Sequence, residues 1–541
     1  MLKRKNGSWA CGALVLVLAF ALPAHADEAK SLDEVRNTVI NLLDALVQRG
    51  VMTKEQAQQM VAEAQSKAER DAKARTESDA DAGSAVRVTY VPQVVKDEIS
   101  AQVSEQVRPQ VVKDVVAQAQ SEQWGVPAAL PEWIRGVTFT GDVRVRQQMD
   151  LFASDNAEFV YLDFLKVNQR GGIGKAGTSA FLNTTEDRMR SRVRARLGAE
   201  AKLGEDFTAG IKLATGNFTD PVSTNQTLAQ SGGRYTFGVE QAYLRYDART
   251  GPDWSWLALT GGRMANPLVS TDLVFDNDLT FEGFTGTYRH AFTSAARSDH
   301  NAFLTLGAFP IEEVELSSDD KWLYAAQLGM VWKFDNRLRL RGALGYYHYD
   351  NVTGIRNPFD STVFDYTAPL YLQKGNTLFD IRNDADPSTN LFALASDYHL
   401  VDVLVGFDLP MFSNYQLSMF ADYVTNVGYN RDDVFARTGL DIEGRTDGYM
   451  VELGFGHPKV DRLRNWRAAV RYRYLQRDAV LDAFTDSDFH LGGTDAQGFV
   501  LRGDYGLGKN VFLSLRYLSA NEIDGPPLGI DVVQLDLNGQ F

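Results

Sequence analysis

The sequence predicts an all-β fold, a 16-stranded antiparallel transmembrane β-barrel preceded by a small periplasmic helical or coiled-coil region. Three observations predict it. After residue 137, apolar and polar residues alternate at period two in about sixteen segments. The connections between the segments are alternately long and short, and the last segment ends on Phe541. A bilayer requires such a sheet to close, because an edge strand would leave backbone groups unpaired in lipid.

The first 26 residues have the pattern of a secretory signal peptide. A basic stretch over 3–5 precedes an apolar run over 13–22 and a small-residue cleavage site at 24–26. Its removal takes away three cations and no anions, and changes the formal net charge from -15 to -18. The one cysteine, Cys11, lies in this segment, so the mature chain is expected to have no disulfide. A chain this acidic is expected to bind no nucleic acid.

Two helical segments are predicted within residues 27–123. The segment 27–75 is expected to form a helical hairpin or a coiled coil, 76–91 a linker, 92–123 a second helical segment and 124–136 another linker. In the first segment apolar residues recur at three- and four-residue steps: Leu32, Val35, Val39, Leu42 and Leu46. This short seam fits a hairpin that closes on itself as well as an intermolecular coiled coil.

Residues 137–541 are predicted to form the barrel. The expected strands are 137–148, 188–203, 206–217, 237–247, 254–264, 280–290, 301–310, 323–334, 337–349, 398–408, 414–426, 447–457, 465–477, 496–506, 510–520 and 531–541. Their lengths suit tilted membrane strands of about 9 to 11 residues. No segment after the signal peptide approaches the length of a membrane-spanning apolar helix.

The connections indicate how the barrel is oriented. Residues 149–187 and 350–397 are long connections, whereas 204–205 and 507–509 are short ones. Bacterial outer-membrane barrels have long external loops and short periplasmic turns. We therefore expect the outer membrane of a Gram-negative bacterium, with outer-membrane lipid around the barrel and the N-terminal helical region in the periplasm.

Arginine recurs at every second position in several segments. The predicted pore-lining residues are Arg188, Arg190, Arg192, Arg194, Arg196, Arg337, Arg339, Arg341, Arg467, Arg471 and Arg473. They alternate with apolar or small residues, and an arginine on the lipid face near mid-membrane costs about 2–4 kcal/mol. The five in 188–196 are therefore expected to face a water-filled lumen. The alternative, a solvated face of a soluble sheet, is disfavoured by the repetition.

The connection after the fifth segment combines carboxylates with apolar side chains. Its predicted constriction residues are Arg263, Asn266, Pro267, Asp272, Asp276, Asp278 and Glu282. Apolar residues lie among them: Leu268, Leu273, Val274 and Phe275. We expect this loop to fold into the barrel, where its acids face the arginines and set a transverse field. An ordinary external loop is the alternative.

These residues resemble a known family. The stretch Gly262-Arg263-Met264-x-Asn266-Pro267, the segment 272–276 and Glu282-Gly283 resemble the putative porin family of Gram-negative outer membranes. Phe275 stands where that family usually has Trp. The overall plan is similar, more distantly, to the phosphate-selective porins and the general trimeric porins. The resemblance implies a homotrimer, an eyelet made by the inward loop and the basic wall, and recognition of Phe541 by the barrel assembly machinery.

The sequence indicates no enzyme, and no cofactor or metal is expected. The histidines have no metal-ligand spacing, and neither a G-x-S-x-G elbow nor a P-loop is present. The predicted function is passive diffusion of small hydrophilic solutes or ions through the barrel. The alternatives are a selective anion or phosphate porin, an envelope tether whose N-terminal helices bind peptidoglycan or a periplasmic partner, and a barrel hydrolase.

Overall fold

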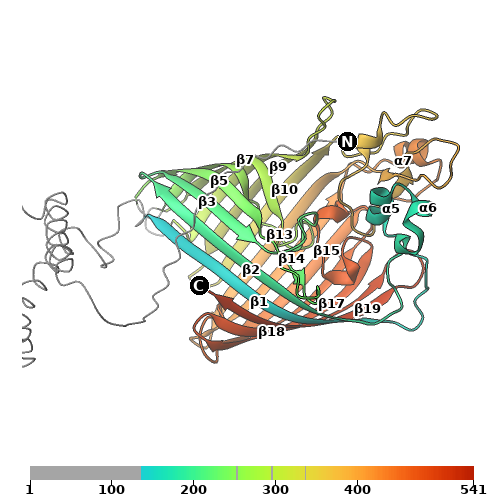
Figure 1. Cartoon of the computed structure of the whole chain (residues 1–541). Coiled ribbons are helices and arrows are strands. Elements are labelled where there is room, and N and C mark those ends of the chain that lie inside the picture. Colours follow the sequence, from blue (N-terminus) through green and yellow to red (C-terminus); the bar gives the residue numbers. More distant parts are fainter. Residues whose placement is uncertain (1–135, 252–253, 294–296, 336) are drawn as a thin grey trace, which may run out of the picture. The chain divides into compact units, whose positions relative to one another are not determined.

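The computed structural model describes residues 136–541 except 252–253, 294–296 and 336 (Figure 1). The predicted signal peptide, the N-terminal helices and both linkers, apart from Gly136, lie outside the described residues. None of the described helices is long and apolar enough to cross a membrane.

The described residues form one closed antiparallel sheet of sixteen long strands. The strands are β1 (Val137–Phe152), β2 (Arg188–Leu203), β3 (Phe207–Ala214), β5 (Gly238–Arg249), β6 (Ser255–Ala265), β7 (Thr280–Ala291), β8 (His300–Glu312), β9 (Lys321–Lys333), β10 (Arg339–Asp350), β13 (His399–Met411), β14 (Tyr415–Asn426), β15 (Asp447–Gly456), β16 (Trp466–Leu475), β17 (Ala496–Gly508), β18 (Val511–Glu522) and β19 (Gly529–Gln540). The predicted 16-stranded antiparallel barrel is confirmed.

Short elements lie in the connections. They are α5 (Phe164–Arg170), α6 (Ile173–Ala176), η2 (Gly177–Ala180), β4 (Gln226–Thr227), η3 (Asp365–Thr367), β11 (Leu378–Asp380), β12 (Phe392–Leu394), α7 (Arg431–Thr438), η4 (Asp482–Phe484) and η5 (Phe489–Leu491). The helices α5, α6 and α7 lie at the long-loop end of the barrel, opposite the chain's C-terminus (Figure 1).

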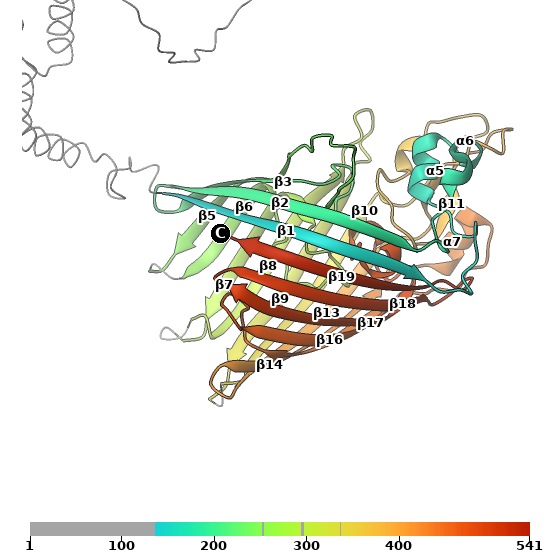
Figure 2. The same ribbon diagram turned by 60° about the horizontal axis from the view of Figure 1, so that its bottom comes forward.

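The first and last strands close the barrel. β1 pairs with β19 from Asp142, opposite Gln540, to Phe152, opposite Ile530 (Figure 2). Beyond this register the backbone N–H groups of Gly141 and Phe541 each donate to the other residue's carbonyl, at 2.9 and 3.0 Å. A Cβ atom at residue 141 would lie 2.3 Å from the Phe541 ring, so a larger residue there would displace the ring.

The two faces of the wall differ as the alternation predicts. On β2, Met189 and Leu197 are exposed on the outer face, whereas Arg194 and Arg196 contact groups inside the barrel. On β10, Leu344 is exposed outward and Tyr347 is fully buried inward. The outer face is therefore apolar, as a lipid-facing surface must be.

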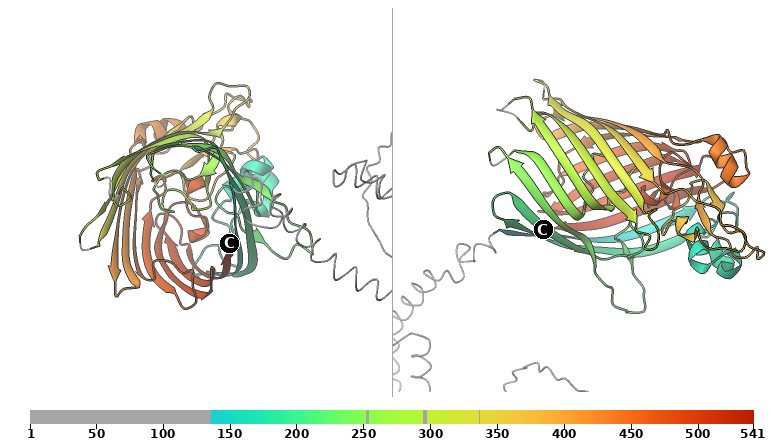
Figure 3. Two further views of the ribbon diagram at one scale, coloured as in Figure 1. Left: turned by 90° about the vertical axis from the view of Figure 1, so that its left-hand side faces the viewer. Right: turned by 90° about the horizontal axis from the view of Figure 1, so that it is seen from above.

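Loops from the long-loop end fill much of the interior (Figure 3). The first inward loop (266–279) follows β6, and the second inward loop (476–495) follows β16. Both contribute to one apolar cluster with inward-facing wall residues, and the Phe275 ring lies 5.2 Å from the rings of Phe281 and Tyr347. All four apolar residues expected to anchor the first loop are buried in that cluster. The cluster rests on strands β7 to β10 and β13 to β16, so apolar side chains cover much of the inner wall there.

Candidate functional site

The two inward loops are hydrogen-bonded to each other inside the barrel. The backbone N–H of Asp276 donates to the carbonyl of Phe484 at 2.7 Å, and the Thr485 hydroxyl donates to the carbonyl of Asp272 at 3.0 Å. The N–H of Ser487 donates to Asp276 Oδ2 at 3.1 Å. The loops therefore form one unit, and their carboxylates are held at fixed positions relative to the wall.

Asp272 binds the wall through Arg471 of β16. Arg471 Nη1 lies 2.5 Å from Asp272 Oδ2, and its Nη2 lies 2.6 Å from Glu452 Oε2 of β15. Burial alone would raise the pKa of Asp272, but the charges of Arg471 and Arg473 outweigh it and hold that pKa below its usual range. Asp272 is thus a fixed negative charge matched by a fixed positive one.

Asp278 faces the arginines of β2. Its Oδ1 lies 3.3 Å from Arg194 Nη1 and 3.4 Å from Arg196 Nη1. On the other side both arginines bind Asp142 of β1, at 2.7 and 2.6 Å. Burial opposes ionisation of Asp278, yet Arg194 and Arg196 hold its pKa below the usual value. The two guanidinium groups are thus fixed between two carboxylates.

Asp488 of the second inward loop is a central carboxylate that the sequence analysis did not single out. Its Oδ2 lies 2.8 Å from Arg146 Nη1 and 3.2 Å from Arg516 Nη1, and its Oδ1 lies 3.8 Å from Arg192 Nη1. Arg146 also binds Asp536 of β19 at 2.8 Å. Although burial would raise it, the pKa of Asp488 is held well below its usual range by these arginines.

The two inward loops share one carboxylate spacing, which is the signal that would have found Asp488. Each loop has the pattern Asp-x-x-x-Asp-x-Asp, at Asp272, Asp276 and Asp278 and again at Asp482, Asp486 and Asp488. In the first loop the middle carboxylate accepts the N–H of Asp278 at 2.7 Å. In the second it accepts the N–H of Asp488 at 2.8 Å. The shared turn presents the third carboxylate of each loop to the arginines.

A central cavity of about 290 Å³ lies between the loops and the wall. Its arginines are Arg144, Arg146, Arg194, Arg471, Arg502 and Arg516. Its carboxylates are Asp272, Asp276, Asp278, Glu452, Asp486, Asp488 and Asp536. Cations and anions nearly balance, so the cavity carries a field between opposite walls and little net charge.

An outer cavity of about 320 Å³ adjoins the central one on the long-loop side. It is lined by alternate residues of one strand, Arg188, Arg190 and Arg192 of β2. Ser487 and Asp488 line both cavities. The arginines of β2 therefore extend from the outer cavity to the central one.

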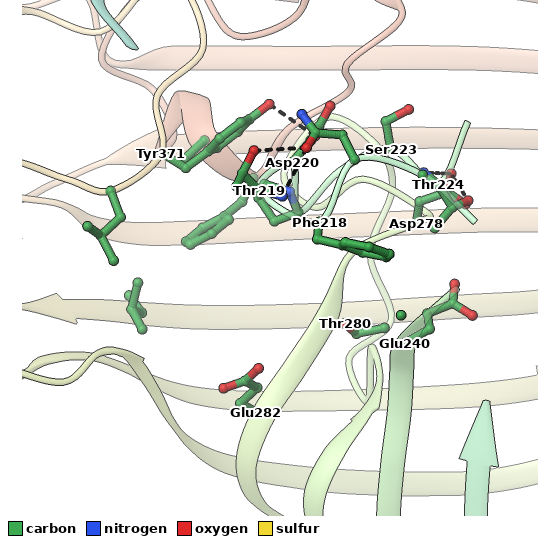
Figure 4. Close-up of a pocket in the computed structure, with 18 of the residues that line it drawn as sticks. Phe218, Thr219, Asp220, Ser223, Thr224, Glu240, Asp278, Thr280, Glu282 and Tyr371 are labelled. Carbon is green, nitrogen blue, oxygen red and sulfur yellow. Dashed lines mark hydrogen bonds between the residues drawn. The ribbon is translucent and has the colours of Figure 1, made fainter. Parts of the chain in front are cut away.

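A side cavity of about 610 Å³ lies against the opposite wall (Figure 4). Its lining includes the aromatic residues Phe218 and Tyr371 and the carboxylates Asp220, Glu240 and Glu282. The Tyr371 hydroxyl donates to Asp220 Oδ1 at 3.1 Å. Burial raises the pKa of Asp220, which has no ion-pair partner among the described residues. This cavity is more acidic than the central one.

Residues 36–541 match the model of a protein family described as putative porin. The chain belongs to the putative porin family. Family membership and the closed barrel make it an outer-membrane β-barrel, and they point to a channel, not an enzyme. No curated protein matches the chain.

Several solved outer-membrane barrels are similar to this porin in fold. The outer membrane channel DcaP of Acinetobacter baumannii is 13% identical with a TM-score of 0.39, over 75% of this chain and 97% of DcaP. OprB of Pseudomonas putida is 14% identical with a TM-score of 0.42, over 75% and 95%. OmpF of Salmonella typhi is 11% identical with a TM-score of 0.39, over 76% and 100%.

The other predicted constriction residues of this porin lie at the start of the first inward loop. Arg263 and Glu282 form an ion pair across β6 and β7. Asn266 and Pro267 begin the loop, and Asn266 Nδ2 donates to Ser270 Oγ at 2.8 Å. Arg263 and Glu282 line the side cavity, away from the central arginines.

Not all predicted pore-lining arginines meet the inward loops. Arg473 is fully buried and donates to Thr485 at 2.7 Å, whereas Arg467 donates to Ser418 at 2.9 Å, closer to the short-turn end. Arg188 is exposed at the outer cavity. The inward loops therefore contact arginines of β2 and the arginines of β16 that lie near its long-loop end.

The arginines of β10 lie apart from the loops. Arg341 binds Asp408 of β13 at 2.7 Å, and Arg339 donates to the carbonyl of Ser298 at 3.3 Å. Arg337 lies in the turn before β10, with φ 68°, and not on the strand where the sequence pattern placed it. The turn is closed by the N–H of Arg337 donating to the carbonyl of Phe334 at 2.9 Å.

The described residues contain no group of three or more His, Cys, Asp or Glu side chains arranged to hold a metal ion.

Asp482 is expected to make the loops less stable as the pH rises from about 4 to about 7. Burial raises its pKa to about 7, so the fold favours the protonated form. Its stabilising effect is complete below about pH 4, is lost at about 1.4 kcal/mol for each pH unit between there and pH 7, and changes no further above pH 7. Thermal unfolding of the purified barrel between about pH 4 and pH 8 measures this loss. Asp482→Asn should flatten the profile, and an unchanged profile would contradict the assignment.

Proposed function

We propose that this porin is a passive diffusion channel for small hydrophilic solutes or ions, with an arginine-lined wall opposite acidic inward loops. The observation that carries the proposal is the set of ion pairs between loop and wall, in which Asp272, Asp278 and Asp488 each bind arginines across the lumen. A charged groove that crosses a closed barrel conducts hydrated solutes without chemistry or energy input.

The geometry supports a route along one side of the barrel. The apolar cluster packs against the inner wall of β7 to β10 and β13 to β16, next to the side cavity. The outer and central cavities lie along β1, β2 and β16 to β19, and they meet at Ser487 and Asp488. A solute that entered from the long-loop end would pass the arginines of β2 before reaching the central cavity. The transverse field would then orient polar solutes in transit.

A selective anion porin is the second candidate, and Arg144 favours it. Arg144 lines the central cavity, and its Nη2 donates to the amide oxygen of Asn225 at 2.5 Å. Its buried Nε has no hydrogen-bond partner, and the guanidinium forms no ion pair among the described residues. A carboxylate or phosphate in the cavity would supply that partner.

Removal of the β2 arginines tests the proposal. Joint replacement of Arg192, Arg194 and Arg196 with alanine should raise single-channel conductance, because three bulky side chains leave the lumen. It should also lower the anion-to-cation permeability ratio by up to about tenfold, the scale on which a charged cleft concentrates counter-ions. Planar-bilayer currents and reversal potentials in a salt gradient measure both. Arg431→Ala is the matched control, since Arg431 pairs with Asp441 on the exposed helix α7. Unchanged conductance and selectivity would refute the assignment.

The proposal includes a homotrimer. Gln147 and Ser191 lie on the outer face of β1 and β2, because they alternate with the inward Arg146 and Arg192. Ser191 Oγ donates to Gln147 Oε1 at 2.6 Å, on a surface that is otherwise apolar. Lipid offers no acceptor for the amide hydrogens of Gln147. We therefore infer that a second copy of the chain packs against Gln147 and Ser191.

The remaining partners also belong to the proposal. Outer-membrane lipid would cover the apolar outer face, and the barrel assembly machinery would recognise the last strand at Phe541. The N-terminal region would be periplasmic, because it directly precedes β1, whose first residues pair with the end of β19 at the short-turn end of the barrel. The rival tether to peptidoglycan depends on residues 27–123, which lie outside the described part of the chain.

A further inference from the structure

The first inward loop is attached to the wall by a continuous chain of hydrogen bonds. The Val269 N–H donates to Gln327 Oε1 at 2.8 Å, and Gln327 Nε2 donates back to the Val269 carbonyl at 2.7 Å. Gln327 Nε2 also contacts the Tyr347 hydroxyl at 3.1 Å, which donates to Asp402 Oδ2 at 3.1 Å. These bonds connect the loop to β9, β10 and β13.

The chain of bonds ends in two neighbouring carboxyl groups. Asp402 of β13 and Asp422 of β14 lie diagonally opposite each other on the same face of two paired strands, since Asp402 pairs with Val424 and Leu404 pairs with Asp422. Their exposed fractions are 1% and 2%. The loop returns to this pair through the Thr271 hydroxyl, which donates to Asp422 Oδ2. The pair therefore joins the loop to the wall at a second point.

Each of these carboxyl groups has one oxygen without a donor. Asp402 Oδ1 and Asp422 Oδ1 are buried and have no hydrogen-bond partner. Within the described residues, no lysine, arginine or histidine forms an ion pair with either group. A buried oxygen left without a donor is costly, and two adjacent buried carboxylates cannot both hold their charge without a cation.

The groups packed around the pair do not supply that cation. Gln327 of β9, Tyr347 of β10 and Thr271 of the loop are uncharged at neutral pH. The charged group that faces Asp422 is Asp272, whose own charge is matched by Arg471 of β16. A proton held by the pair would supply a donor that the surrounding groups do not.

We propose that Asp402 and Asp422 hold one shared proton, and that this protonated pair, the acid clasp, keeps the first inward loop against the wall. At alkaline pH the proton leaves, two like charges face each other, and the clasp opens. The loop then moves away from β13 and β14, and the channel's conductance changes. The clasp positions the loop and does not contact solute. Its effect on conductance rests on the proposed channel function.

Conductance of the full-length protein in planar bilayers, titrated from about pH 6 to about pH 10, tests the clasp. The wild type should show a conductance step on the alkaline side. Asp402→Asn should lose the step, because its amide donates to Asp422 without a titrating proton. Asp402→Ala should show the alkaline conductance already at neutral pH. Asp408→Asn, on the same strand but ion-paired with Arg341, and Asp482→Asn should both keep the step.

A second measurement keeps the clasp testable apart from conduction. The sequence has one cysteine, in the predicted signal peptide, so Val269→Cys places a single thiol on the loop of the mature chain. Its labelling rate by a neutral thiol reagent should rise at alkaline pH more than in the Val269→Cys, Asp402→Asn double variant. Equal rates in the two proteins, or a conductance step that survives Asp402→Asn, would overturn the clasp. The wild type could fail to conduct while the alkaline rise in labelling rate is still larger in Val269→Cys than in the double variant. That result would refute the channel and retain the clasp.

Discussion

Asp488→Asn is expected to make the channel more anion selective and less stable. The substitution removes one negative charge that faces Arg146, Arg192 and Arg516, so three guanidinium groups lose a shared counter-ion. The cost should be about 3 kcal/mol, at the low end of the range for a broken buried ion pair, because the Asp488 side chain is 15% exposed. Arg146 keeps its bond to Asp536, which limits the loss.

Reversal potentials in a salt gradient and thermal unfolding of the purified barrel measure these two effects. Asp441→Asn is the control, since it also removes a carboxylate from an arginine pair, but on the exposed helix α7. That control should leave the selectivity unchanged. It should change the free energy of unfolding by no more than about 1 kcal/mol, the usual limit for a surface pair. A shift toward cations in Asp488→Asn would contradict the assigned place of Asp488.

Arg471→Gln is expected to have the opposite effect on selectivity. It leaves Asp272 and Glu452 without their shared cation beside the central cavity, so the channel should become more cation selective. The stability cost should be about 3–5 kcal/mol, because two largely buried carboxylates lose their partner at once. The first inward loop should also detach from β16, since Asp272 is its ion-pair contact with that strand.

The same bilayer recordings measure this variant. Arg382→Gln, which breaks the pair with Asp365 in an external loop, is the matched control and should leave selectivity unchanged. Reversal potentials of Arg471→Gln and Asp488→Asn should move in opposite directions from the wild type. If the reversal potentials of both variants shifted in the same direction, the result would contradict a transverse field between the loops and the wall.

The barrel itself could be predicted from the sequence because its periodicity is local. The β2 arginines alternate with Met189, Val193 and Leu197, and that alternation fixes which side chains share a face without any knowledge of distant strands. The predicted strand 188–203 agrees with β2 at both ends. Arg337 does not follow the predicted alternation, because it is itself a turn residue with positive φ just before β10 begins.

The partners of the arginines depend on barrel closure, which local patterns do not contain. Asp488 binds Arg146 across 342 residues of sequence, and this pair exists only because β1 closes on β19 beside the second inward loop. Asp276 lines the central cavity with its neighbours but forms no ion pair among the described residues, and it accepts the N–H of Ser487. The repeated Asp-x-x-x-Asp-x-Asp spacing was the one local sign of the second loop.

The most direct test of the channel assignment is the single-channel current of the purified wild-type protein in a planar bilayer. We predict stepwise, ohmic current increments in salt solution, with reversal potentials that shift when Asp488 or Arg471 is replaced. A protein that inserts as a folded barrel yet gives no current increments would contradict the account.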